Sequence, residues 1–552
     1  MRWVVWAGLA ATVFLPCLAA AQGRLPSTVE PGRERVAPPA VPQGEFDLSI
    51  TQPRRVPRDR DVDALRFTVR EVVVEGATVL RADELAALTG PLIGREAALS
   101  DVLAVAEAIE ASYRTAGYLM TRAFVPPQRS RNGVFRILVV EGYVGSVAVE
   151  GVDAAEAGRV KAFLAPVLAE RPLRNDTMER ALLLLNDQPG LKVSGLLKPS
   201  KDETGAADMV VSAKLKPAEV TASLDNRSSR YEGPWSAGSD LAVMSPTGHG
   251  ERLSAGLSTS PELVKKRALR LGYLQPLGSD GLTSAVSLDY SMGRPGYTLE
   301  DAGARTFSMT LGSRLAYPLI RGRAESVILD GGLSLRTASS HVDGASVAFD
   351  RWRVADLKLA WTQSGWLSGI DTAALGVARG LPMLGGSQRG DASLSRPGIN
   401  TAFTKLTLDL SRLQSLAPSW SLYVGTSGQY SFDTLFAGEE FALGNSTFGH
   451  GFDPSSLVGD HGIGGTAQLR WDVSSTAPQL QSVMLYTFYD AGVTWVRTTD
   501  TQQGLASFGG GVRIGLTESH DINIEAAHRL YGTQSTVGGH FARLMLSLTG
   551  RF

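Results

Sequence analysis

The second half of the chain repeatedly alternates apolar and polar residues. Leu269, Leu271 and Tyr273, for example, alternate with Arg270 and Gly272. A period of two residues predicts β-strands with one apolar and one polar face. The polar faces carry full charges, which suit a water-filled lumen better than a packed interior. These charges are Arg270, Asp289, Lys405, Asp409, Arg470, Asp472 and Arg529.

The last ten residues, 543–552, form a segment of this kind that ends in an aromatic residue. Leu544, Leu546, Leu548 and Phe552 lie on one face. A strand of about ten residues with one lipid-facing side fits the wall of an outer-membrane barrel. At about 20 residues per strand and connection, the chain after position 218 predicts about sixteen antiparallel strands.

Two tandem α/β units precede the barrel. The first shows helical spacing at 101–115, with Ser100 as the expected N-cap and Gly117 as the stop. The second shows helical spacing at 176–186, where Asn175 is a possible N-cap. We expect strands at 67–74, 119–125 and 134–141 in the first unit, and at 145–149, 191–197 and 209–215 in the second.

The N-terminus has the pattern of a secretory signal peptide. A basic start precedes an apolar run and a small-residue cleavage site, so we expect residues 1–21 to be removed. A transmembrane anchor, the alternative, would need a longer apolar run. Cys17, the only cysteine, lies in this segment, so the mature chain has no disulfide and no cysteine metal site. Residues 22–64 are rich in proline, which is typical of an extended linker.

Composition and motifs argue against nucleic-acid binding and catalysis. The net charge of −1 gives no basic surface for nucleic acid. The sequence lacks a P-loop, a G-x-S-x-G elbow and an H-E-x-x-H pair. Its seven histidines form no cluster with metal-ligand spacing. We therefore expect no enzyme activity, no nucleotide, no cofactor and no metal site.

Local motifs resemble those of two-partner secretion transporters, an outer-membrane family with two periplasmic POTRA domains before a sixteen-stranded barrel. Residues 113–118, 121–128 and 137–142 resemble the family's first POTRA pattern: a G-Y helix end, an R-A strand with a P-P-Q turn, and a V-x-E-G strand. Residues 184–191 resemble its L-N-D-x-P-G turn, and residues 225–229 resemble its entry into the first barrel strand.

The resemblance implies α+β periplasmic POTRA domains followed by an all-β transmembrane barrel of about sixteen antiparallel strands. It divides the chain into a signal peptide (1–21), a linker (22–64), POTRA 1 (65–142), POTRA 2 (143–218) and the barrel (219–552). Family members often carry a helix that plugs the barrel. The prolines of the linker argue against a long helix here.

The resemblance also implies a functional loop inside the barrel. The wider superfamily folds one long loop back into the lumen, with a V-R-G-F tip and a later G-D-x-G motif. The matching residues are Gly449, His450, Gly451 and Phe452 at the tip, then Gly459, Asp460 and Gly462. The F-x-D-x-G motif of the barrel wall, which faces the lumen, corresponds to Phe488, Asp490 and Gly492.

At the loop tip, histidine stands where the family has arginine. An arginine could make a permanent forked contact with Asp490, whereas His450 is shorter and changes charge near neutral pH. We expect His450 to contact Asp490 in the lumen, with an anchor that is looser or shared with other groups. The alternative is a solvated His450 without a partner.

The implied function is the export of an unfolded partner protein to the cell surface. An extended passenger segment would add to the edge of the second unit, near Leu191, Val193 and Leu197, through backbone hydrogen bonds. The alternative for these three residues is a place in the domain core. Phe552 is implied as part of the signal read by the barrel-assembly machinery. The expected partners are thus the passenger, outer-membrane lipid and that machinery.

Three rival functions share parts of the pattern. A barrel-assembly or insertase factor has the same barrel motifs but usually more POTRA units. A barrel-anchored hydrolase would need a catalytic constellation, and a passive porin would not need two periplasmic domains. We therefore expect a transporter in the bacterial outer membrane, with its POTRA domains in the periplasm.

Overall fold

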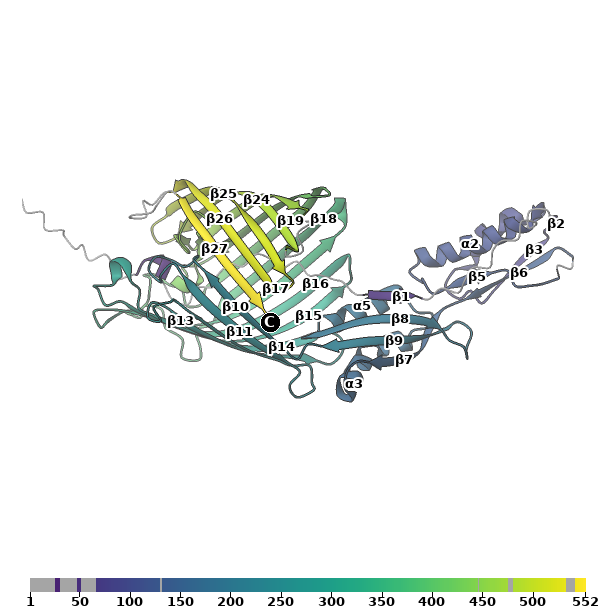
Figure 1. The fold of residues 1–552 in the computed structure, drawn as a ribbon, viewed down its shortest axis with the longest axis horizontal. Coiled ribbons are helices and arrows are strands. Elements are labelled where there is room, and N and C mark those ends of the chain that lie inside the picture. The colour runs from purple at the N-terminus through teal and green to yellow at the C-terminus, as the bar shows by residue number, and fades with distance from the viewer. Residues whose placement is uncertain are drawn as a thin grey trace, which may run out of the picture.

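The computed structural model describes residues 25–29, 47–50, 66–129, 132–444, 446–474, 480–532 and 542–552. They form a barrel with two α/β units extending from one end (Figure 1). We call the barrel end that faces these units the near end, and the opposite one the far end. Among the described residues, no helix is long and apolar enough to cross a membrane. The expected signal peptide lies outside the described residues.

The barrel is a closed antiparallel sheet of sixteen strands, which confirms the expected number. Because β27 returns to pair with β10, the wall has no free strand edge, and its backbone groups are satisfied without water. The strands are β10 (Ala218–Asp225), β11 (Ser236–Met244), β12 (Arg252–Thr259), β13 (Arg267–Leu277), β14 (Leu282–Gly293), β15 (Arg305–Arg321), β16 (Glu325–Val342), β17 (Ala345–Ser364), β18 (Gly369–Gly380), β19 (Thr404–Ala417), β20 (Trp420–Ser431), β23 (His461–Val473), β24 (Ser482–Val496), β25 (Thr501–Thr517), β26 (His520–Gly532) and β27 (Ala542–Arg551).

The two faces of the barrel wall differ as expected. Leu271, Leu408 and Leu544 are exposed on the outer face, where lipid would cover them. On the lumenal face, Arg270 Nε donates to Asp289 Oδ1 of the neighbouring strand at 3.0 Å. The two-residue alternation therefore separates an apolar outer surface from a charged lumen.

The seam that closes the barrel is short. It covers five residue pairs between β10 and β27, against eight between β10 and β11. Asn226 extends it with its side chain: Nδ2 donates to Leu544 O at 3.0 Å, and Oδ1 accepts from Leu546 N at 2.7 Å. The backbone N–H of Asn226 also donates to Leu546 O at 3.2 Å, so backbone and side-chain amides together continue the pairing where the first strand ends.

The first α/β unit packs helices against a three-stranded sheet of order β3-β6-β5. Ile109, Tyr113 and Ile137 are fully buried in its core. Its elements are β2 (Arg66–Thr68), β3 (Glu71–Glu75), α1 (Ala82–Thr89), β4 (Glu96–Ala98), α2 (Leu99–Thr115), β5 (Arg122–Phe124) and β6 (Val134–Val140).

Two expectations for this unit are wrong in detail. The first strand is broken at Val69, whose N–H donates to Arg95 O at 3.0 Å instead of continuing a single ladder. Ser100 is not the N-cap of α2, because the Asp101 carboxylate accepts from Ala98 N–H at 2.9 Å and the helix begins one residue earlier than Ser100.

The second α/β unit has a four-stranded sheet of order β1-β8-β9-β7. Met178, Leu182 and Leu185 on α5 are buried against this sheet, as the helical spacing predicts. Asn175 is the first residue of the helix and not its cap. The elements are β1 (Asp47–Ile50), β7 (Tyr143–Glu150), α3 (Ala154–Phe163), α4 (Ala165–Ala169), α5 (Asn175–Asn186), β8 (Leu191–Pro199) and β9 (Ala206–Leu215).

Ion pairs fix the second unit to the near end of the barrel. Arg321, at the end of β15, donates to both carboxylate oxygens of Asp187 at 2.7 Å. Arg323 lies 3.3 Å from Glu179 of α5. Asp187 belongs to the segment that resembles the L-N-D-x-P-G turn, so this motif contacts the barrel directly. The forked Arg321 contact sets the orientation as well as the attachment.

The described parts of the linker lie at opposite ends of the barrel (Figure 1). A short 3₁₀ helix, η1 (Ser27–Val29), packs at the far end, where Leu25 and Val29 are buried with Ala304. Ser27 Oγ donates to Ser455 O at 2.7 Å. β1 pairs with the second α/β unit at the near end. The described residues of the linker contain no helix longer than η1.

The Glu141 carboxylate links several segments of the first α/β unit by hydrogen bonds. Its carboxylate accepts from Thr78 N at 2.7 Å, from Val79 N at 3.2 Å and from Tyr113 OH at 2.5 Å. Burial opposes ionisation of Glu141, but these hydrogen bonds outweigh it and lower the pKa of the carboxyl group. Burial and the bond to Glu141 together raise the pKa of Tyr113 to about 12.

Glu141→Gln should lower the free energy of unfolding of this unit by about 1–2 kcal/mol at neutral pH, because the amide accepts more weakly and Glu141 is only partly buried. A carboxylate with a lowered pKa stabilises the fold above its unfolded pKa, and that stability is lost as pH falls. The difference between variant and parent should therefore shrink below about pH 4.

Hydrogen exchange of the α2 amides in the full chain measures this difference. Glu75→Gln is the matched control, because Glu75 is exposed and lies 3.6 Å from Arg136. Equal protection of α2 in the Glu141 variant and the parent at neutral pH would contradict the assigned role.

Candidate functional site

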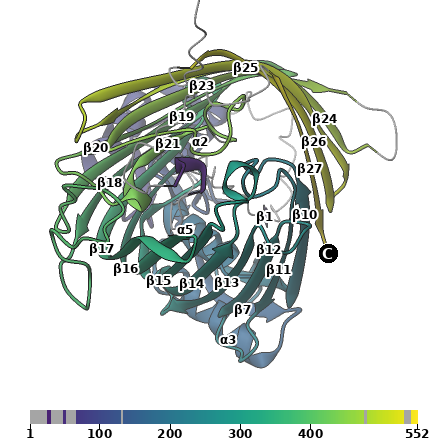
Figure 2. The same cartoon turned by 90° about the vertical axis from the view of Figure 1, so that its left-hand side faces the viewer.

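A long loop between β20 and β23, residues 432–460, folds from the far end back into the lumen. In it, η5 (Ala437–Glu439) precedes a hairpin of β21 (Phe441–Leu443) and β22 (Leu457–Gly459). Figure 2 shows β21 inside the ring of barrel strands. Apolar side chains of the loop bury one another against the wall strand β25. The buried cluster is Phe441, Leu443, Phe448, Phe452, Leu457 and Leu505.

The tip of the loop reaches Asp490, near the middle of β24. His450 Nδ1 lies 2.6 Å from Asp490 Oδ2, and both side chains are buried. The His450 ring also packs against Phe488, with ring centroids 4.4 Å apart. The expected contact between His450 and Asp490 is therefore present in the lumen, and His450 is not a solvated loop residue.

Asp490 is an acceptor shared by several groups. The backbone N–H groups of Gly449 and His450 donate to Oδ2 at 3.2 and 3.1 Å, and Ser507 Oγ donates at 3.1 Å. Because these donors carry no titratable charge, they hold the tip whether or not His450 is protonated. The expected alternatives were a looser anchor and a shared one, and the contacts correspond to the shared one.

Gly449 stands where the family has valine, and the backbone gives the reason. Its φ is +80°, a region that side chains disfavour. An added Cβ would also approach Leu505 Cδ1 to 2.8 Å. The glycine thus permits the sharp turn that points two successive N–H groups at Asp490.

Arginines of the barrel wall contact the tip from β26 and β27. Arg529 Nε donates to Gly451 O at 2.7 Å, and its guanidinium lies 4.9 Å from the centre of the Phe452 ring. Arg543 donates to Phe452 O and lies 3.5 Å from Asp453. Two positively charged side chains of the wall therefore hold the tip in addition to its contacts with Asp490.

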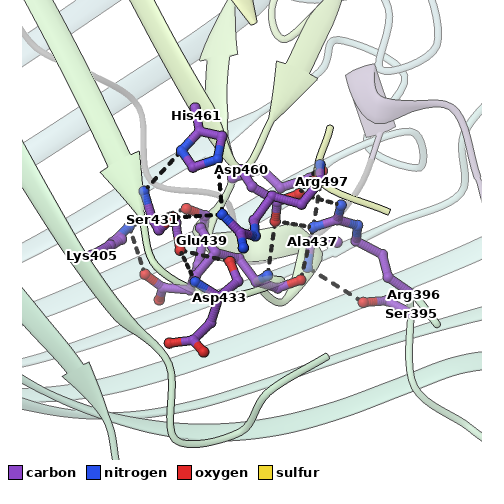
Figure 3. Close-up of polar contacts among 12 residues, drawn as sticks. Ser395, Arg396, Lys405, Ser431, Asp433, Ala437, Glu439, Asp460, His461 and Arg497 are labelled. Carbon is purple, nitrogen blue, oxygen red and sulfur yellow. Dashed lines mark hydrogen bonds and ion pairs between the residues drawn. The ribbon is translucent and has the colours of Figure 1, made fainter. Parts of the chain in front are cut away.

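The base of the loop is held by Arg396, which comes from the connection between β18 and β19 (Figure 3). Its two Nη atoms reach the two oxygens of Asp460 at 2.8 and 2.9 Å. Backbone N–H groups of Leu435 and Arg497 donate to the same carboxylate at 2.8 and 2.9 Å. Asp460 is fully buried and Arg396 is 3% exposed. The buried Glu440 carboxylate also lies 3.2 Å from Arg396, so this one guanidinium compensates two buried carboxylates.

Glu439 forms a second buried ionic contact beside the first (Figure 3). Lys405 Nζ lies 2.8 Å away, Arg336 Nη1 lies 3.0 Å away, and Trp352 Nε1 donates at 2.7 Å. Lys405 was expected to be a solvated lumenal charge, and this contact corrects that expectation. Arg396 and Glu439 were not found from the sequence, because neither lies in a motif and no local pattern marks them.

Glycines of the two motifs let the loop approach the wall. An added Cβ on Gly462 would come 2.0 Å from Phe441 Cδ1, and one on Gly492 would come 2.6 Å from Leu443 Cδ1. Gly459 is packed against the backbone of β24 in the same way. A side chain at these positions would push the hairpin away from the strands that hold it.

The other expected site residues lie elsewhere. Leu191, Val193 and Leu197 are buried in the core of the second α/β unit, so their side chains do not form a free passenger surface. The Phe552 ring is exposed, while its backbone pairs with Val220 at 2.8 and 3.1 Å. Within the described ranges, no group of three or more histidines and carboxylates is placed to hold a metal ion.

His450→Arg should lower the resting conductance of the channel, because a permanently charged guanidinium can make a forked contact with Asp490 and hold the tip more firmly. Planar-bilayer recordings measure the conductance, with His520→Arg at a near-end turn as control. Equal conductance of His450→Arg and the parent would contradict this role.

Comparison with known proteins agrees with these motifs. Residues 208–514 match the family model described as haemolysin secretion/activation protein ShlB/FhaC/HecB. Residues 67–142 match the model of the ShlB-type POTRA domain. The heme/hemopexin transporter protein HuxB of Haemophilus influenzae is 24% identical over 90% of this chain and 89% of its own length.

Solved structures share the fold. CdiB from Escherichia coli superposes with a TM-score of 0.72 at 21% identity, covering 90% of this chain and 93% of that one. BamA from Haemophilus ducreyi, lacking POTRA domains 1–3, gives a lower TM-score of 0.51 at 14% identity, over 88% of this chain. Because the first family model spans more than half of the sequence, this chain belongs to the haemolysin secretion/activation family ShlB/FhaC/HecB.

Proposed function

We propose that this chain is an outer-membrane translocator, which binds an unfolded exported partner protein through its POTRA units and conducts it through the barrel to the cell surface. The observation that carries this proposal is the placement of a closed barrel, with a loop held in its lumen, directly behind a docked α/β unit. A passenger arriving at that unit is already at the near end of the lumen. The near end then faces the periplasm, and the far end faces the outside.

The proposed division of the chain into functional parts rests on the resemblance to the transporter family. We assign residues 1–21 to the signal peptide, 22–64 to the linker, 65–142 and 143–218 to the POTRA domains, and 219–552 to the barrel. The sequence has no nucleotide-binding motif. Folding of the passenger outside the cell therefore supplies the driving force for transport.

The alternative hypothesis, a function in barrel assembly, is less well supported than secretion. The likeness to BamA is in fold alone, with a lower TM-score than that of CdiB. The family to which the chain belongs consists of transporters. The P-P-Q turn and the two α/β units also favour secretion over insertion.

Deletion of this transporter should remove one large exported protein from the medium, because no other route would carry it across the outer membrane. Mass spectrometry of the medium and cell surface, before and after deletion, measures the loss. Restoring the parent gene should restore secretion, and the gene next to the transporter is the first candidate for the partner. An unchanged set of exported proteins would contradict the proposal.

Phe552 is proposed to form part of the signal read by the barrel-assembly machinery, with the outward leucines in contact with lipid. Its exposed ring lies 5.5 Å from that of His520, at the near end of the barrel. Removal of Phe552 should lower the amount of folded barrel in the membrane, which heat-modifiable gel mobility measures. Phe552→Tyr keeps an aromatic ring and is the control. Unchanged assembly of the truncated chain would leave Phe552 as an interfacial aromatic only.

A further inference from the structure

The second α/β unit carries a strand that comes from outside it. β1, four residues of the linker, adds in parallel to β8. Its register runs from Asp47 opposite Ser194 to Ile50 opposite Leu197. In the sheet order β1-β8-β9-β7, β8 would be an edge strand if β1 were absent. The edge expected to receive a passenger is therefore occupied by the chain itself.

The contact has one specific side-chain position. Leu48 packs against the core cluster of the second unit, directly opposite Gly195. An added Cβ on Gly195 would lie 3.0 Å from Leu48 Cδ1, closer than ordinary packing allows. Ser49, the next residue, is exposed. The edge thus recognises an extended strand through backbone hydrogen bonds and accommodates one aliphatic side chain over Gly195.

β1 uses less than half of the available edge. It pairs with four residues of β8, which is nine residues long. Each additional backbone hydrogen bond contributes about 0.5–1.5 kcal/mol, so a longer strand that pairs with more of β8 would bind more tightly. The tether to the chain gives β1 an advantage only through its effective concentration, which a longer passenger segment can outweigh.

We propose that β1 is a resident competitor for the passenger-binding edge. An extended segment of the passenger, parallel to β8 and carrying an aliphatic residue over Gly195, displaces β1 and takes its place. This inference rests on the proposed function, since it names how the exported partner is recognised. The chemistry of the partner is an unfolded segment in which an aliphatic residue is followed by a polar one.

Peptide binding to the full chain in lipid nanodiscs tests the competition. The probe is a fluorescent synthetic peptide with the sequence of residues 45–52. Leu48→Asp weakens the resident strand and should increase the affinity for the peptide roughly tenfold. Ser49→Asp, at an exposed position of the same strand, is the matched control and should bind like the parent. A peptide with aspartate in place of its leucine should not bind.

The position over Gly195 is tested in the Leu48→Asp background. Adding Gly195→Val should abolish peptide binding, because its side chain fills the space of the incoming leucine. Hydrogen exchange of the β9 amides shows whether the unit remains folded in this variant. Equal peptide affinity of the parent and Leu48→Asp, or full binding by a folded Gly195→Val variant, would overturn the proposal.

A reversible lock tests the same competition during secretion. Ser49 and Leu196 are paired across β1 and β8, and Cys17 is the only cysteine in the sequence. Neighbouring strands lie within the distance that a disulfide can span. The double variant Ser49→Cys, Leu196→Cys should stop both peptide binding and secretion when oxidised and recover both when reduced. Ser49→Cys alone should behave as the parent.

The two proposals can fail separately. If the parent exports no partner protein, the proposed function fails, while the peptide experiments still test the edge. If the parent secretes and the oxidised lock secretes equally well, the resident competitor is wrong and the transporter function stands.

Discussion

The rest of the structure depends on the need to satisfy every backbone hydrogen bond within the barrel wall. Lipid offers no partners for N–H and C=O groups, so the sheet must close. Sixteen strands satisfy this constraint and enclose a lumen lined with charges. Closure also produces the short seam between β10 and β27, where the side chain of Asn226 adds two hydrogen bonds to the backbone pairing.

A wide, charged lumen requires an occupant if the resting barrel is to be shut, and the loop of residues 432–460 provides one. Its apolar residues cover one another against β25, while its charged residues meet charges of opposite sign. Breaking a buried ion pair by removing one partner costs about 3–5 kcal/mol, because the remaining charge is uncompensated. Arg396 with Asp460 at the base, and Asp490 at the tip, are therefore the contacts that keep the loop in place.

Much of the architecture was predictable because barrel strands and POTRA units obey local patterns. The alternation of apolar and polar residues at Leu269–Tyr273 predicted a wall with different environments on its two faces. The F-x-D-x-G motif predicted Asp490 as the partner of the tip. The helix starts were less predictable. Ser100 and Asn175 have the right chemistry for N-caps, but both lie inside their helices. Such ends are decided by a single hydrogen bond, such as that of Asp101.

Contacts between distant segments were beyond local patterns. Arg396 meets Asp460 only because the register of several strands brings two loops together at the far end. β1 is four residues long and lies in a proline-rich linker, so its strand conformation follows from the edge of β8 and not from its own sequence. The contacts of Arg529 and Arg543 with the loop tip likewise depend on the path of the loop.

The conductance of the Arg396→Gln channel in planar bilayers is the most direct test of the claim that the buried ion pair keeps the loop in the lumen. Arg412→Gln is the matched control, because Arg412 forms an arginine–aspartate contact with Asp371 at 2.8 Å away from the loop. We predict a higher resting conductance for Arg396→Gln and an unchanged one for Arg412→Gln. A folded Arg396→Gln barrel that conducts no more than the parent would contradict the account.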